Sequence, residues 1–168
     1  MAKIVKLLCV FFATLSVLLC GYGGGEKEKA ELCADFQADF SADYKGLTVK
    51  GSLSATHQGL CVMTVSSPET LSGVQIRCKS GEVAVSRGAV QATADEGYLP
   101  ESSLPSVIRE LFKAVATRQY TAAGDNTYSL TLSCGDCKLT ADGDFLLQTA
   151  EIPGCCKVQF YNCEKIGE

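Results

Sequence analysis

The sequence predicts a mainly β domain with one amphipathic helix. Apolar and polar residues alternate with period two through most of residues 33–93 and 127–163, as in strands with one buried face. Between these stretches, over residues 103–117, apolar residues change to helical spacing. The connections between the strand segments are short, which favours antiparallel neighbours.

The N-terminus has the layout of a bacterial export signal. Two lysines precede an apolar run over residues 7–19, which is shorter than the roughly 20 residues that span a bilayer. Cys20 closes this run, at the position of the lipidated cysteine of a lipoprotein, although Leu19 stands where a small residue is usual. The alternative is cleavage after a small residue such as Gly23, which releases a soluble secreted protein.

We therefore expect a signal peptide over residues 1–19, a lipidated cysteine with a flexible tether over 20–32, and one β domain over 33–168. The mature chain of about 150 residues is the size of a single domain. Lipidation of Cys20 would anchor the protein in the cell membrane at its extracytoplasmic face. The formal net charge is -4, so nucleic acid is not an expected partner.

The first half of the domain is predicted to be an antiparallel meander. Residues 33–44 alternate without interruption, and the turn at Lys45-Gly46 leads into a second strand over 47–55. Further strands are expected over residues 60–65, 74–79, 82–86 and 89–93. Pairing of the third strand with the fourth would place Cys61 opposite Cys78.

The second half contains the helix and the remaining strands. One apolar stripe covers residues 103–117 at the spacing i, i+3, i+4: Leu104, Val107, Ile108, Leu111, Phe112 and Val115. Ser102 or Ser103 is the expected N-cap, and Pro105 fits the first turn. Later turns are expected at Gly135-Asp136, Asp142-Gly143 and Pro153-Gly154, for about ten strands in all.

Three passages of the chain resemble the lipoprotein-carrier (LolA/LolB-like) superfamily, in particular small lipoproteins of Gram-positive anaerobes. They are FQADFSADYKGLTVKGSL, VMTVSSPETLSGVQI and KLTADGDFLLQTAEIPGCCKVQFYNCE. The resemblance implies a strongly curved antiparallel sheet, a half-open barrel, whose concave face is covered by a helical lid and holds acyl chains. The expected anchor and the many cysteines depart from the carriers, and no arginine here matches the carriers' functional one.

The leading expectation is a non-enzymatic protein that is anchored to the membrane through Cys20 and binds a hydrophobic ligand, a lipid or an acyl chain, between sheet and helix. The residues expected to line that space are apolar and share a face: Phe36, Phe40, Leu53, Ile108 and Phe112. The alternative is a structural or protein-interaction module of the cell envelope, in which the same faces pack on each other and the partner is another envelope protein.

Eight of the ten cysteines follow Cys20, and an even number in an exported chain favours disulfides. The candidate pairs are Cys61 with Cys78 and Cys134 with Cys137, and free buried thiols are the alternative. The Cys134–Cys137 spacing also suits thiol redox chemistry, but no helix follows it. A zinc site that adds Cys155 and Cys156 would need adjacent strand residues to point the same way.

The single histidine, His57, falls in an expected turn and belongs to no recognisable catalytic set. We therefore expect no catalytic residue, no cofactor and no metal.

Overall fold

The computed structural model describes residues 31–167; the expected signal peptide and Cys20 lie outside the described residues. The strands are β1 (Phe36–Tyr44), β2 (Leu47–Ala55), β3 (Cys61–Ser67), β4 (Gln75–Lys79), β5 (Glu82–Arg87), β6 (Val90–Asp95), β7 (Thr121–Gly124), β8 (Thr127–Leu132), β9 (Gly135–Ala141), β10 (Leu147–Ile152) and β11 (Cys156–Lys165). The α-helix is α2 (Leu104–Ala116), and two short 3-10 helices are η1 (Glu69–Leu71) and η2 (Glu96–Tyr98). The predicted mainly β class with a single α-helix is confirmed for this part of the chain.

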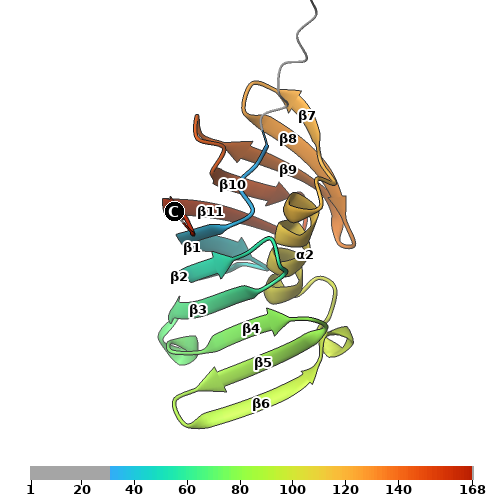
Figure 1. The fold of residues 1–168 in the computed structure, drawn as a ribbon. Helices are drawn as coiled ribbons and strands as arrows, with labels where there is room; N and C mark the ends of the chain where they lie inside the picture. Colours follow the sequence, from blue (N-terminus) through green and yellow to red (C-terminus); the bar gives the residue numbers. More distant parts are fainter. Residues whose placement is uncertain (1–30, 168) are drawn as a thin grey trace, which may run out of the picture. The chain divides into compact units, whose positions relative to one another are not determined.

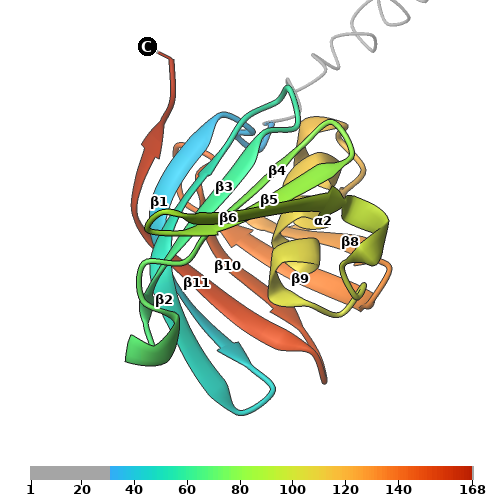
Figure 2. The same ribbon diagram turned by 90° about the horizontal axis from the view of Figure 1, so that it is seen from below.

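All eleven strands form one antiparallel sheet in the order β6-β5-β4-β3-β2-β1-β11-β10-β9-β8-β7 (Figure 1). A twisted open sheet of this width curls rather than staying flat. The strands accordingly curve around α2, which lies inside the curve (Figure 2). The curved open sheet covered by a helix is the architecture that the family resemblance implied.

The alternating pattern of the first strands places their apolar residues on the face toward α2. Phe36, Ala38, Phe40 and Ala42 are buried along β1. The β1–β2 turn is the predicted one, with positive φ angles at Lys45 (49°) and Gly46 (79°). Cys61 pairs with Cys78 between β3 and β4, in the predicted register.

Strands from the two ends of the described chain pair at the centre of the sheet. β1 runs antiparallel to β11, and Phe40 lies opposite Phe160. A register shift between Gln37 and Asp39 marks a bulge, and Asn162 on β11 has a φ of 53° there. This pairing joins the two meanders into one sheet, and no local pattern in the sequence predicted it.

The position of α2 follows from the strand order. β6 and β7 are the two edges of the sheet, yet only residues 96–120 connect them. That connection must cross the sheet, and it carries α2 over the concave face (Figure 1). Within residues 31–167, no helix is long and apolar enough to cross a membrane.

Three local predictions were wrong. β7 was not predicted, because its residues are all exposed and show no apolar alternation. The β8–β9 turn consists of Ser133 and Cys134 rather than Gly135-Asp136, since Leu132 pairs with Gly135. β10 begins at Leu147 and not at Phe145, whose φ of 61° interrupts the extended backbone.

Gly51 permits a close approach between two strands of the sheet. It lies on the buried face of β2, where the register against β3 shifts after Lys50. A Cβ at this position would overlap the Thr64 carbonyl oxygen and would lie 3.0 Å from Cε1 of Phe40. The absent side chain therefore leaves room for both the neighbouring backbone and the Phe40 ring.

Candidate functional site

The lid helix α2 begins at a side-chain cap and buries one face. Ser103 is its N-cap and accepts a hydrogen bond from the Ser106 N–H, and Pro105 occupies the first turn. The buried residues of α2 include the whole predicted stripe: Leu104, Val107, Ile108, Leu111, Phe112 and Val115. The exposed face carries Lys113, so the helix covers the sheet with its apolar side.

The five residues predicted to line a ligand space all lie in the layer between the sheet and α2. They are exposed by only 0–3 %: Phe36, Phe40, Leu53, Ile108 and Phe112. The structure thus brings both sets together at one buried interface. Whether this interface opens to a ligand stays a prediction.

Three aromatic rings form the centre of that layer. The Phe36 ring lies 5.4 Å from the Phe112 ring and 5.7 Å from the Phe160 ring, measured between centroids. Phe112 and Phe160 are 6.1 Å apart and meet edge to face. Phe160 was absent from the predicted set because its contact with β1 depends on the long-range pairing of β11. Its place on a terminal aromatic strand was the only signal for it.

A pocket of about 270 Å³ opens beside the C-terminal half of α2. It lies between the helix, the β2–β3 turn, the β4–β5 turn and η2. Its apolar lining comes from the β2–β3 connection, β3 and the helix: Leu60, Cys61, Phe112 and Ala116. Phe112 therefore belongs both to the buried aromatic layer and to the wall of a surface pocket.

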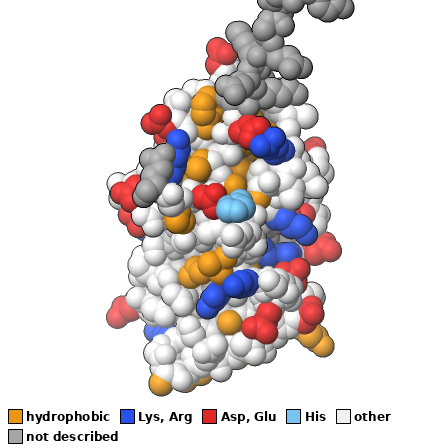
Figure 3. Space-filling model, in the orientation of Figure 1, with side chains coloured by type: hydrophobic (Ala, Val, Ile, Leu, Met, Phe, Trp, Pro, Cys, Tyr) orange, Lys and Arg blue, Asp and Glu red, His pale blue; other side chains and the backbone are white. Residues whose placement is uncertain are grey.

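We call this the lid pocket. Three basic residues line it, Lys79, Arg109 and Lys113, together with one carboxylate, that of Glu96. Arg109 Nη1 pairs with Glu96 Oε2 at 2.9 Å. Blue basic side chains lie beside and below the pale-blue His57 on this face of the molecule (Figure 3).

Polar contacts fasten α2 to the sheet. Near its N-terminus, the Tyr44 hydroxyl donates to the Ser102 carbonyl oxygen at 2.8 Å. In the middle, Glu110 accepts from the Ser133 N–H at 2.9 Å and from the Ser133 hydroxyl at 2.6 Å. The Glu110 contacts are exposed, so water competes for the same groups, whereas the Tyr44 contact is partly buried.

His57 lies in the predicted turn, at the rim of the lid pocket. Its Nδ1 is 2.8 Å from Asp35 Oδ1, and the imidazole remains largely exposed. Although burial acts in the opposite direction, the hydrogen bonds from His57 lower the pKa of Asp35 below its ordinary value. This pair links the β2–β3 turn to the start of β1.

Seven cysteines within residues 31–167 carry free thiols: Cys61, Cys78, Cys134, Cys137, Cys155, Cys156 and Cys163. Cys61 and Cys78 are buried opposite each other, and burial raises the pKa of Cys61 to about 12. Cys134 does not face Cys137 across a hairpin, because Leu130 is the partner of Cys137. Neither predicted disulfide is formed in this structure.

Four cysteines nevertheless gather where the β8–β9 turn meets the β10–β11 turn. The Cys155 thiol interacts with the thiols of both Cys134 and Cys156. Burial and the Cys155 thiol raise the pKa of Cys134 to about 11, and burial raises those of Cys137 and Cys156 to about 12. Such thiols are protonated at neutral pH and are poor nucleophiles. Among residues 31–167, no cluster of His, Cys, Asp or Glu is placed to hold a metal ion.

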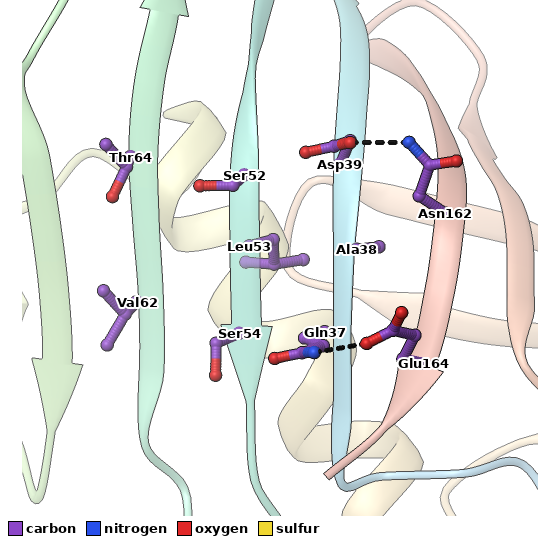
Figure 4. A pocket seen from close by; sticks show the side chains of 10 residues that line it. All are labelled: Gln37, Ala38, Asp39, Ser52, Leu53, Ser54, Val62, Thr64, Asn162 and Glu164. Carbon is purple, nitrogen blue, oxygen red and sulfur yellow. Dashed lines mark hydrogen bonds between the residues drawn. The ribbon is translucent and has the colours of Figure 1, made fainter.

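A second hollow, of about 320 Å³, lies over β1, β2, β3 and β11 on the face of the sheet opposite α2 (Figure 4). Polar pairs cross from β11 to β1: Asn162 Nδ2 donates to Asp39 at 2.8 Å, and Gln37 Nε2 donates to Glu164 at 2.7 Å. The side chains there satisfy one another, as on the wet face of a sheet. The lid pocket is the better candidate for an apolar ligand.

Comparison with known proteins finds no family model that matches the chain and no matching curated protein. Among solved structures, the chain is similar to a LolA superfamily protein from Nitrosomonas europaea, with a TM-score of 0.43 and 8% identity over 83% of this chain and 90% of that chain. It is also similar to a DUF1329 family protein from Desulfovibrio piger, with a TM-score of 0.42 and 13% identity over 81% and 88% of the two chains.

These likenesses concern architecture, and scores this low identify neither a ligand nor an activity. A LolA superfamily protein is among these structural neighbours. The narrower resemblance to lipoproteins of Gram-positive anaerobes stays a prediction.

Proposed function

We propose that this chain is a lipid-anchored, non-enzymatic protein of the extracytoplasmic membrane face, and that its β domain binds a hydrophobic ligand between the sheet and α2. The observation that carries the proposal is the lid pocket of about 270 Å³, whose wall includes Phe112 of the aromatic layer. An acyl chain that enters there gains about 0.8 kcal/mol for each methylene it buries.

Deeper insertion requires α2 to move, because the aromatic layer is closely packed and has no room for a chain. The surface contact between Glu110 and Ser133 is one that must break when the middle of the helix lifts. Breaking such exposed hydrogen bonds costs little, since water replaces the lost partner. The helix can therefore act as a lid, and the contact between Glu110 and Ser133 is one that holds its middle in place.

Binding is tested with a fluorescent fatty-acid probe and with native mass spectrometry of the purified protein. We expect saturable binding of the probe, and co-purified lipid in the mass spectrum. Glu110→Ala should speed uptake of the probe, because it removes the two hydrogen bonds that tie the middle of α2 to Ser133. Glu164→Ala is the matched control, since this carboxylate accepts a hydrogen bond on the opposite face. Absence of saturable binding in all three proteins would contradict the proposal.

A second candidate, the envelope interaction module, is favoured by one observation. All six residues of β6 are exposed, and Val90 is 74 % exposed at this edge of the sheet. Exposed edge strands pair readily with another protein chain. If no ligand binds and the layer under α2 stays closed, this module becomes the better explanation.

The anchoring part of the proposal rests on Cys20 at the end of the apolar run. Cys20→Ser should release the protein from membranes into the medium, as measured by cell fractionation. One acyl chain alone binds membranes only marginally, so firm retention of the unaltered protein implies a diacylated cysteine. Retention of the serine variant at the membrane would show that Cys20 is not the anchor.

A further inference from the structure

The lid pocket combines an apolar wall with an excess of positive charge. Lys79 comes from the end of β4, and Arg109 and Lys113 lie one helical turn apart on α2. Glu96, on η2, is the one carboxylate in the lining. Neutral apolar ligands gain nothing from three cations at the mouth of a pocket, whereas an anionic group is attracted by all of them.

The acidic groups around the pocket are already engaged. Glu96 pairs with Arg109, and Asp35 at the rim binds His57. Neither Lys79 nor Lys113 has a carboxylate partner among the ion pairs of the described residues. The basic side chains of the two lysines are therefore available to an incoming anion.

Arg109 is incompletely satisfied. Its Nη1 pairs with Glu96 at 2.9 Å, but its Nε is buried and has no hydrogen-bond partner among the described residues. A buried donor without an acceptor is unfavourable, and more so on a charged group. Carboxylates and phosphates match the planar fork of a guanidinium with two parallel hydrogen bonds.

The size of the pocket limits the apolar part of such a ligand. A methylene group is similar in size to a water molecule, at roughly 30 Å³, so the volume of about 270 Å³ suits a chain of about nine carbons. Longer chains would have to continue past Phe112 into the layer under α2.

From these observations we infer that the ligand is a single-chain amphiphile with an anionic head group, and that Arg109 binds that head group at the mouth of the lid pocket. The inference rests on the proposed binding function and specifies the chemistry of its ligand. The acyl chain lies along Leu60, Cys61, Phe112 and Ala116, while Lys79 and Lys113 add screened attraction from the rim.

The experiment compares decanoate with decan-1-ol, two probes of equal chain length that differ in charge. Isothermal titration calorimetry on the purified protein, below the micelle concentration of decanoate, should give at least tenfold tighter binding for decanoate. Raising the salt concentration should weaken decanoate binding and leave decanol binding unchanged.

Three variants separate a binding role of Arg109 from a structural one. Arg109→Met should remove most of the difference in affinity between decanoate and decanol, leaving only the screened attraction of Lys79 and Lys113. The control Arg87→Met removes an arginine that donates to the Thr70 carbonyl oxygen outside the pocket, and should have no effect. Glu96→Gln should strengthen decanoate binding, because it removes the competing carboxylate from Arg109, and this readout holds even if Arg109→Met fails to fold.

Equal binding of decanoate and decanol, with no gain in Glu96→Gln, would overturn the head-group inference and leave the hydrophobic-ligand function standing. Binding of neither probe would overturn the proposed function itself. Tight decanoate binding that survives Arg109→Met would assign the head group to another cation and refute the role of Arg109.

Discussion

The lid helix offers the sharpest test of how the domain is held together, through the substitution Leu111→Ala. Leu111 is 1 % exposed and lies at the centre of the buried stripe of α2. Alanine removes three carbon atoms, which at about 0.8 kcal/mol each is roughly 2 kcal/mol of lost burial. The cavity left behind raises the total to about 2–5 kcal/mol, because the packed layer collapses only partly.

Urea unfolding followed by circular dichroism measures this loss. With an m-value of about 2 kcal/mol per molar urea, the midpoint should fall by roughly 1–2.5 M. Lys113→Ala on the exposed side of the same helix is the control, and should change the free energy of unfolding by less than about 0.5 kcal/mol. An unchanged midpoint in Leu111→Ala would mean that α2 is detached from the sheet in solution, and would refute the packed layer.

Two further predictions concern the sheet. Gly51→Ala should lower the free energy of unfolding by about 1–3 kcal/mol, because its Cβ would overlap the Thr64 carbonyl oxygen; Gly143→Ala, with open space around it, is the control, and equal melting temperatures would contradict the close approach. Burial raises the pKa of Cys61 from 9.0 to about 12, so the folded state holds its proton more tightly than the unfolded state. Stability should therefore fall as the pH rises above about 9. A Cys61→Ala variant should lose part of this dependence, and an identical slope in both proteins would count against burial of the thiol.

Local sequence patterns predicted the elements that depend on local physics. Alternation along residues 36–44 placed Phe36 and Phe40 on one face, and both are buried. Helical spacing identified the stripe that contains Leu111, and strand spacing placed Cys61 opposite Cys78. In each case the period of the element, 3.6 or 2, decides which side chains share a face.

The prediction failed where local composition was ambiguous. Gly135-Asp136 is a common turn pair, yet the hairpin turns at Ser133 and Cys134, because the strands keep Leu130 opposite Cys137 on the buried face. The strand β7 has no buried face and hence no pattern to detect.

The sequence by itself determined which residues of β1, β2 and α2 face the layer between sheet and helix, and the five predicted from these elements are all buried. Only the tertiary structure decided that β11 pairs with β1, which brings Phe160 against Phe36 and Phe112. It also decided that the chain crosses from one sheet edge to the other, so that Arg109 meets Lys79 and Glu96 around one pocket. Strand order and helix placement depend on contacts between residues far apart in the chain, and periodicity within a single segment carries no information about them.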